Sequence, residues 1–273
     1  MITFAMNTMD IIELIKQYQH LGIDQVIDHE KFNLISIVHH STRIEGSTLT
    51  EVETQVLLTE GLTPKGKPLH ESLMVTDHYA ALQYALEQAK TKHVITPEFI
   101  QKLNSFIVKN TASTYNTVFG TIDAATGAFR KGNVVAGETY FPNFNKVEAL
   151  TKNLAFDLAG RMQQDLSMRE QLNLSYDAHL NLVSIHPFYD GNGRTSRLLM
   201  NYIQAVFRLP LAIVHNETKT DYYQALIDTR KQEDINIFRA FMDNEYKMLL
   251  SAEISKFEEM QHPKKGKGFT FLF

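Results

Sequence analysis

HPFYDGNGRTSR, residues 186–197, joins two segments of helical periodicity in this 273-residue chain. The glycines of the turn 191–193 let backbone N–H groups converge without interference from a Cβ atom, and the helix that starts there adds free N–H groups and a positive dipole end. Arg194 and Arg197 lie three residues apart, so they share one helix face and lean back toward the helix start. The stretch therefore predicts a site for a polyphosphate anion.

Two titratable side chains flank this predicted anion site. Asp190 supplies a hard carboxylate oxygen, which suits Mg²⁺ bound jointly with phosphate oxygens. His186 lies four residues earlier, and its unperturbed pKa of about 6.5 suits a general base. His179 lies seven residues before His186, on the same helix face, and is expected to be a packed core histidine. A base, a carboxylate, an anion nest and two arginines so close together are the groups that phosphoryl or nucleotidyl transfer requires.

Composition restricts the class of protein. With 44% hydrophobic residues the chain can bury a sizeable core, as one large domain or two small ones. Twenty-seven basic against 31 acidic residues leave a formal charge of −4, which argues against direct nucleic-acid binding. The lack of cysteine excludes disulfides, thiolate metal sites and a cysteine nucleophile. No apolar run of about 18 residues and no signal-peptide pattern are present, so we expect a soluble, cytoplasmic protein without a membrane partner.

Helical periodicity and capping signals predict a mainly α fold. The first helix is expected to start after a cap at Asn7 or Thr8, and the second to end at Gly46. Thr50 and Glu53 form a capping box for the third. The remaining expected helices cover residues 73–88, 97–107 after a Thr96 cap, 147–162, 176–185, 192–207, 222–229 and 235–257. Neither a repeat nor a linker interrupts the chain, which predicts one mostly helical domain with an irregular tail.

The pattern changes between residues 111 and 142, where glycines and β-branched residues replace the helical period. The sequence VVAGETYF, residues 134–141, predicts a short hairpin with glycine first in its turn. The residues assigned to this hairpin are Val134, Val135, Ala136, Gly137, Glu138, Thr139 and Tyr140.

The stretch 186–197 resembles the motif of the Fic family, H-x-F-x-(D/E)-G-N-G-R-x-x-R, at every defined position. The resemblance extends over roughly residues 95–245, including Gly127–Arg130 before the hairpin. It implies a Fic-type helical bundle with a short β-hairpin flap over the active site. The expected organisation is an N-terminal helical region (1–94), a Fic core (95–245) and a C-terminal helix end and tail (246–273), in one compact unit.

The resemblance also implies an activity, namely transfer of AMP from ATP to a Ser, Thr or Tyr hydroxyl of a target protein. His186 would then deprotonate the hydroxyl, Asp190 would hold Mg²⁺, and the hairpin would add the target segment as a strand. Arg230 stands where relatives often carry an asparagine near the adenine. The residues implied in nucleotide binding are Gly191, Asn192 at the α-phosphate, Gly193, Arg194 at the outer phosphates, Arg197 at the γ-phosphate and Tyr223 at the adenine.

A second motif lies N-terminal to the first. Residues 41–46, STRIEG, match the family's inhibitory pattern, (S/T)-x-x-x-E-(G/N), which ends here at Gly46. Ser41 and Glu45 are four residues apart and so share one helix face. Resemblance to the subclass with an N-terminal inhibitory helix implies that Glu45 pairs with Arg197 in place of the γ-phosphate.

Three functions stay open from the sequence. The first is an autoinhibited adenylyltransferase, and the second is removal of AMP from a modified protein, with Glu45 positioning the attacking water. The third is a nucleotide-binding regulator without turnover, against which the intact His186 argues. The sequence does not identify the target protein, and it is compatible with a homodimer without fixing the oligomeric state.

Overall fold

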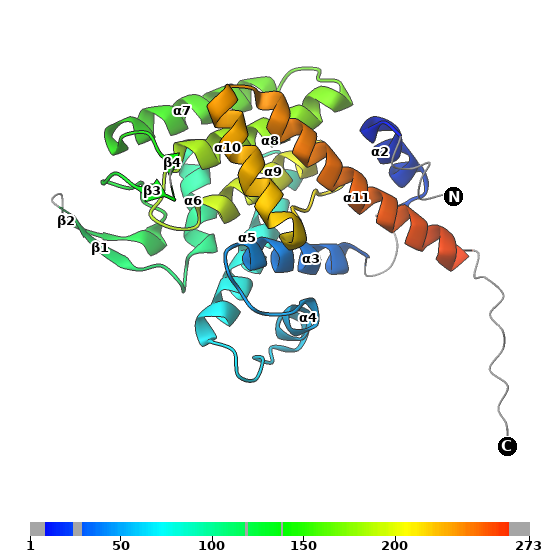
Figure 1. Ribbon diagram of the computed structural model, residues 1–273, viewed down its shortest axis with the longest axis horizontal. Helices are drawn as coiled ribbons and strands as arrows, with labels where there is room; N and C mark the ends of the chain where they lie inside the picture. The colour runs from blue at the N-terminus through cyan, green and yellow to red at the C-terminus, as the bar shows by residue number, and fades with distance from the viewer. Residues whose placement is uncertain (1–8, 24–28, 118–119, 138, 262–273) are drawn as a thin grey trace.

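The computed structural model describes residues 9–23, 29–117, 120–137 and 139–261 (Figure 1). Within these residues the chain forms a helical bundle with two small antiparallel hairpins. The elements are α2 (Ile11–His20), α3 (His29–Ile44), α4 (Glu51–Glu60), α5 (Leu69–Lys90), α6 (Pro97–Ile107), β1 (Thr114–Thr117), β2 (Gly120–Asp123), η2 (Ala124–Thr126), β3 (Val135–Ala136), β4 (Thr139–Tyr140), α7 (Phe144–Arg161), α8 (Met168–Ile185), α9 (Asn192–Val206), η3 (Asn216–Thr218), α10 (Lys219–Gln232) and α11 (Ile235–Gln261).

Helix α9 lies at the centre of the bundle. It packs against α8, α5, α6 and α3, while α11 runs along α8 and α10 and reaches α2 (Figure 1). Because α9 is buried almost all round, its polar side chains need partners inside the protein. Asn201 donates to the Ala212 carbonyl oxygen at 2.9 Å, and the Gln204 oxygen accepts from the Ala212 N–H at 2.9 Å. These bonds fix the second half of α9 against the segment that follows it.

Several helix ends agree with the sequence prediction. The Thr50–Glu53 capping box opens α4, and Thr96 caps α6 by accepting from the Phe99 N–H. Helix α3 ends at Ile44, two residues before Gly46, whose φ of +104° is accessible to glycine at little cost. The cap of α2 was predicted wrongly: Asp10 fills this role, since its carboxylate accepts from the Ile12 N–H at 2.8 Å.

Other helices begin earlier than predicted. Helix α5 begins at Leu69 and not at 73, because Pro68 adopts the extended conformation of an N-cap residue without a side-chain bond. Helix α8 begins at Met168 and not at 176, because Ser167 and Glu170 form a second capping box. The prediction was also too short for α7, which begins at residue 144, and for α10 and α11, which cover residues 219–232 and 235–261.

Both hairpins lie on one side of the bundle, to the left in Figure 1. The predicted hairpin forms with Val135 opposite Tyr140 and Ala136 opposite Thr139, but its strands are only two residues long and leave Val134 outside. The hairpin of β1 and β2 was not predicted. Three predictions concern residues outside the described part of the chain: the caps at Asn7 and Thr8, the turn residue Glu138, and the irregular tail from 262 onward.

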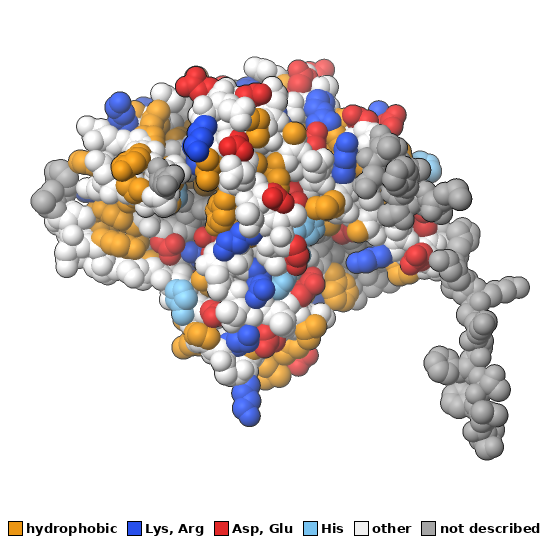
Figure 2. All heavy atoms as spheres, viewed as in Figure 1, with side chains coloured by type: hydrophobic (Ala, Val, Ile, Leu, Met, Phe, Trp, Pro, Cys, Tyr) orange, Lys and Arg blue, Asp and Glu red, His pale blue; other side chains and the backbone are white. Residues whose placement is uncertain are grey.

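The surface carries charges of both signs. Basic and acidic side chains are intermingled over the face in Figure 2, in keeping with the formal charge of −4. Among the described residues, we find no helix whose length and hydropathy would let it cross a bilayer.

Candidate functional site

The loop between α8 and α9 is built from left-handed backbone positions. His186 ends α8 at a φ of +52°, and Gly191 precedes α9 at +75°. A Cβ atom on Gly191 would stand 2.7 Å from Cγ1 of Val108, so only glycine fits there. The Asn192 side chain closes the loop, because its oxygen accepts from the Phe188 N–H and its amide donates to the Phe188 carbonyl oxygen, both at 2.9 Å. The side chain of Asn192 is therefore occupied, and its backbone N–H at the helix start is the group that can bind an anion.

Asp190 and Arg194 lie at the mouth of this loop. Asp190 Oδ1 accepts from the Gly191 N–H at 2.6 Å and from Arg194 Nη2 at 3.3 Å. Arg194 is 3% exposed, its Nη1 donates to the Ile107 carbonyl oxygen, and its buried Nε has no protein partner. An arginine held in this way at a helix start, with a donor left over, is poised for an anion.

Arg197 joins the second motif to the first. Its Nε donates to Ser41 Oγ at 2.9 Å, and its Nη2 donates to the Ser41 carbonyl oxygen at 3.0 Å and to Glu45 Oε1 at 2.7 Å. Glu45 follows the last residue of α3, in the turn whose Gly46 N–H donates to the Arg43 carbonyl oxygen. Two motifs 152 residues apart therefore meet on one guanidinium group.

The Glu45 carboxylate covers the start of α9. A Cβ atom on Gly193 would stand 2.5 Å from Glu45 Oε1, so the carboxylate occupies space directly above the glycine turn. Desolvation opposes ionisation, yet Arg197 and Arg194 together hold the pKa of Glu45 below its ordinary value. The carboxylate is thus an anion resting where the loop and both arginines favour one.

His186 is placed as a neutral base. Its Nδ1 lies 3.3 Å from the Val183 carbonyl oxygen, which can only accept, so Nδ1 carries the proton and Nε2 keeps its lone pair. The ring stacks on Phe141, the residue after β4, at 3.9 Å between centroids. Burial lowers the pKa of His186 to about 4, helped by the Arg130 and Arg230 charges. The imidazole is therefore unprotonated at neutral pH.

Arg130 connects the hairpin region to this loop, a role that the sequence did not reveal. The side chain is 1% exposed, and its guanidinium group donates to three carbonyl oxygens, those of His186 at 2.7 Å, Gly132 at 2.8 Å and Pro142 at 2.5 Å. Its own N–H donates to the Pro187 carbonyl oxygen. Arg130 thus fixes the backbone of the base and both ends of the segment that carries β3 and β4.

We expect Arg130→Lys to lower catalytic turnover at this site by roughly tenfold while the fold is retained. An ammonium group is a single point donor and cannot span three carbonyl oxygens, so one or more of the bonds, each contributing about 1–3 kcal/mol, is lost. The measurement is turnover beside a far-UV circular dichroism spectrum. Lys131→Arg, at the next residue, is the matched control, and equal turnover in Arg130→Lys would contradict the role assigned.

A buried chain of side chains supports Arg197 from behind. Its Nη1 lies 3.4 Å from the Tyr222 hydroxyl, which in turn lies 2.9 Å from Nε2 of His179. His179 is fully buried and stacked on Phe238, so the expectation of a packed histidine is confirmed. Tyr223 lies beside Tyr222 with ring centroids 5.3 Å apart, on the outer side of α10 and 41% exposed.

The predicted flap residues line the edge of the same region. Val135 and Tyr140 face solvent, 53% and 84% exposed, so the hairpin presents apolar side chains on its outer side. Asn104, which the sequence did not single out, donates to the Asp190 carbonyl oxygen at 3.0 Å and to Thr195 Oγ1 at 3.1 Å. It holds the loop from the α6 side.

The protein side chains at this site can hold Mg²⁺ only together with oxygen atoms of a bound polyphosphate. Among the described residues no group of three or more His, Asp or Glu side chains is arranged to hold a metal ion. Asp190 is one carboxylate, 42% exposed, with Oδ1 already hydrogen-bonded. Because Mg²⁺ keeps several waters and is commonly held by one or two carboxylates plus phosphate oxygens, a single Asp190 suffices when a polyphosphate is present.

Stability is expected to fall as the pH is lowered from about 7 to about 5. Burial lowers the pKa of His39 and of His186 to about 4, and lowers the pKa of His78 and His179 as well. Below about pH 6.5 the unfolded chain therefore binds more protons than the folded one, so the free energy of unfolding drops by at most about 1.4 kcal/mol per histidine and pH unit. The midpoint of thermal unfolding, measured across this pH range, tests the prediction. His39→Gln should weaken the dependence of the midpoint on pH. A midpoint that stayed constant in the unchanged chain would contradict the prediction.

The bundle thus presents an arginine pair, a glycine turn and a base at one helix start, groups that suit a phosphate anion. Residues 94–204 match the model of the Fic/DOC family. These residues are a domain of this family. It is 28% identical over 251 residues to "Protein adenylyltransferase Fic" of Drosophila mojavensis, covering 86% of this chain and 47% of that protein. The namesake of Drosophila willistoni is 30% identical over 206 residues, covering 75% of this chain and 38% of that protein.

Solved structures share the fold. A Fic domain containing signaling protein from Bacteroides thetaiotaomicron superposes with a TM-score of 0.77 at 22% identity, over 91% of this chain and 97% of that one. Fic-1 from C. elegans gives 0.74 at 23% identity, over 96% of this chain and 74% of the solved chain. The expected Fic-type bundle with a hairpin flap is confirmed. The chain spans about half the length or less of the curated relatives it matches.

Proposed function

We propose that this chain moves AMP from ATP to a hydroxyl side chain of a target protein, and that Glu45 restrains the reaction. The observation that carries the proposal is the meeting of a neutral His186, the glycine turn at the start of α9 and two buried arginines, one of which Glu45 occupies. The curated relatives named protein adenylyltransferase support it.

In this reaction the loop orients the nucleotide and His186 moves the proton. The backbone N–H groups of Asn192 and Gly193 and the Arg194 guanidinium group bind phosphate oxygens, and Arg197 binds the γ-phosphate. Nε2 of His186 takes the proton of the target hydroxyl, whose oxygen bonds to the α-phosphorus. The bond from that phosphorus to the bridging oxygen breaks, and pyrophosphate leaves. A Mg²⁺ ion held by Asp190 and phosphate oxygens would offset negative charge there.

Two surfaces are assigned to the substrates. The exposed outer side of the hairpin, with Val135 and Tyr140, would receive the target segment as an added strand. Tyr223 lies close enough to Tyr222, and so to Arg197, to border the adenine. Arg230 lies beside the hairpin, with its guanidinium carbon 5.8 Å from the centre of the Phe141 ring.

Inhibition follows from competition for Arg197. The Glu45 carboxylate is an anion 2.7 Å from Nη2 of that arginine and stands over Gly193. A γ-phosphate cannot use the same donor at the same time, so ATP binds in a poor orientation while α3 stays in place.

Removal of AMP from a modified protein is the second candidate. The Glu45 side chain is 28% exposed at the mouth of the site, so its carboxylate can reach a water as well as Arg197. The two reactions place opposite demands on this residue: its loss raises transfer and abolishes removal.

Labelled ATP tests the proposed function. Glu45→Gly protein incubated with Mg²⁺ and α-labelled ATP should become labelled, whereas γ-labelled ATP should leave it unlabelled because the γ-phosphate departs with pyrophosphate. Label from the γ-phosphate would contradict AMP transfer. ATP binding without any labelled product would favour the nucleotide-binding regulator.

A further inference from the structure

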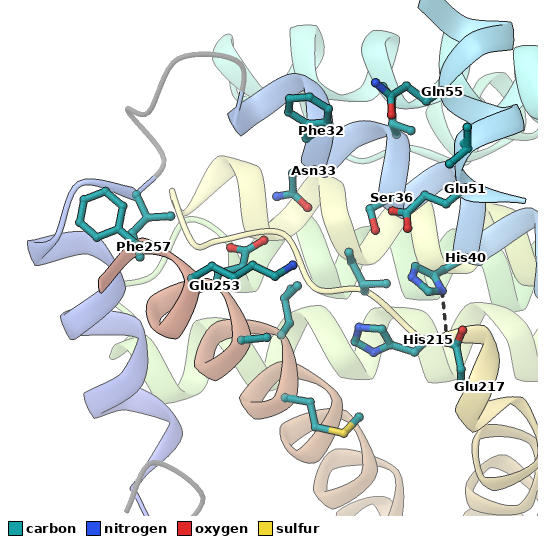
Figure 3. A pocket seen from close by; sticks show the side chains of 18 of the residues that line it. Phe32, Asn33, Ser36, His40, Glu51, Gln55, His215, Glu217, Glu253 and Phe257 are labelled. Atoms are coloured by element: carbon teal, nitrogen blue, oxygen red, sulfur yellow. Dashed lines mark ion pairs between the residues drawn. The ribbon is translucent and has the colours of Figure 1, made fainter. Parts of the chain in front are cut away.

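A groove separate from the site runs along the outer face of α3. It has a volume of about 810 Å³ and is bordered by α3, α4, the 213–218 segment and α11 (Figure 3). Figure 3 shows Phe257 of α11 at one end and His40, His215 and Glu217 at the other. A concavity of this size is in the range of ligand-binding pockets.

The lining of the groove combines apolar side chains with an excess of carboxylates. Phe32, Val52, Met248 and Met260 line it and are 54%, 69%, 45% and 66% exposed, which is unusual for large apolar side chains gathered in one place. Three carboxylates, those of Glu51, Glu217 and Glu253, face one lysine, Lys256. Burial and the neighbouring His215 lower the pKa of His40, so the His40 imidazole does not offset this charge at neutral pH. The groove suits a segment that is both basic and apolar.

This chain carries such a segment directly after α11. Residues 262–273, HPKKGKGFTFLF, place three lysines before alternating phenylalanines at 269, 271 and 273. The segment starts next to Met260, which lines the groove, and 12 extended residues reach up to roughly 40 Å. Alternate residues of an extended chain share one face, so all three aromatic rings can enter an apolar groove together.

We propose that residues 262–273 of this chain dock in the groove and clamp α3 in its inhibitory position. Helix α3 lines the groove with Ser36 and His40 and holds Arg197 with Ser41. On the groove side, His40 Nδ1 is 2.8 Å from Asn216 Oδ1, ahead of α10. A segment bridging α11 to α3 and α4 adds contacts that must break before Glu45 can leave. The clamping, though not the docking, rests on the proposed function.

The lack of tryptophan in the chain provides a direct test of docking. In the full chain, Phe271→Trp should give a blue-shifted emission that a soluble quencher reaches poorly. Met248→Glu in that background should shift the emission toward that of an exposed indole, and so should reversing Lys264, Lys265 and Lys267 to glutamate. Phe156→Glu is the matched control, because Phe156 is 83% exposed on α7, outside the groove, and should change nothing. An exposed indole in the parent variant, or no response to Met248→Glu, would overturn docking.

Dilution and labelling complete the test. The emission should not depend on protein concentration, whereas a blue shift lost on dilution would assign the segment to a second copy and overturn docking within one chain. Met248→Glu should raise labelling with α-labelled ATP about fivefold, at the lower end of ordinary coupling between sites. Unchanged labelling beside an active Glu45→Gly would overturn the clamp. If Glu45→Gly were also inactive, the proposed function would fail while the emission still decided docking.

Discussion

Replacing Glu45 with glycine is expected to raise labelling from α-labelled ATP by roughly 10- to 150-fold. The carboxylate makes a 2.7 Å charge-assisted bond to Arg197, which contributes about 1.5–3 kcal/mol, and each 1.4 kcal/mol corresponds to a factor of ten. Its removal leaves Arg197 hydrogen-bonded to Ser41 and Tyr222, so the guanidinium group stays in place for a γ-phosphate. The measurement is the initial rate of label incorporation by the variant and the unchanged chain.

Two further variants separate the charge from the backbone. Glu45→Gln keeps the shape of the side chain and loses its charge, so its rate should lie between those of the unchanged chain and Glu45→Gly. Glu60→Gly places a glycine at the end of another helix, α4, and should have no effect. Equal rates in Glu45→Gly and the unchanged chain would show that the pair with Arg197 does not limit transfer.

The fold was predictable where apolar periodicity and caps coincide, and not elsewhere. The α4 capping box and the Thr96 cap of α6 are local signals, so they could be found from the chain alone. Strands β1 and β2 gave no such signal, since Ile122 is their only buried residue and short, exposed strands lack a regular alternation. The capping box at Ser167 was present in the sequence but was not recognised, which cost the first two turns of α8.

In the candidate site, too, some residues could be predicted from the local sequence and others could not. The groups in residues 186–197 act on one another through a single loop, so their spacing predicts their arrangement. Arg130, by contrast, reaches the His186 carbonyl oxygen across 56 residues, and Asn104 reaches that of Asp190 across 86. Such partners depend on tertiary packing and leave no trace in local spacing. Glu45 and Arg197 are further apart in the sequence, by 152 residues, and only the resemblance of the inhibitory motif indicated their contact.

Asn192 illustrates a finer limit of motif-based interpretation. Its position in the motif implies contact with the α-phosphate, yet both ends of its side chain bind the Phe188 backbone. The amide thus shapes the loop, and the backbone N–H is the group left for the anion. A residue type in a motif therefore indicates that a group is needed without saying which of its atoms is used.

Substituting His186 by alanine in the Glu45→Gly background is expected to lower labelling by roughly 100- to 10,000-fold, the usual contribution of a positioned general base. ATP affinity should change little, because Arg194, Arg197 and the glycine turn remain. Parallel measurement of nucleotide binding and of label incorporation separates these effects. His70→Ala, at an exposed histidine near the start of α5, is the comparison, and labelling that survived the loss of His186 would exclude His186 as the base.

The pH dependence of the Glu45→Gly rate gives a second measure of the same group. A base must be unprotonated to act, so the rate is constant above its pKa and falls tenfold per pH unit below it. Burial lowers the pKa of His186 to about 4 without nucleotide, and a bound polyphosphate anion raises it toward the unperturbed value of about 6.5. The inflection is therefore expected between these two values, with a flat rate at neutral pH. A rate that rose as the pH was lowered through this range would require the protonated imidazole and would reverse the role of His186 from base to acid.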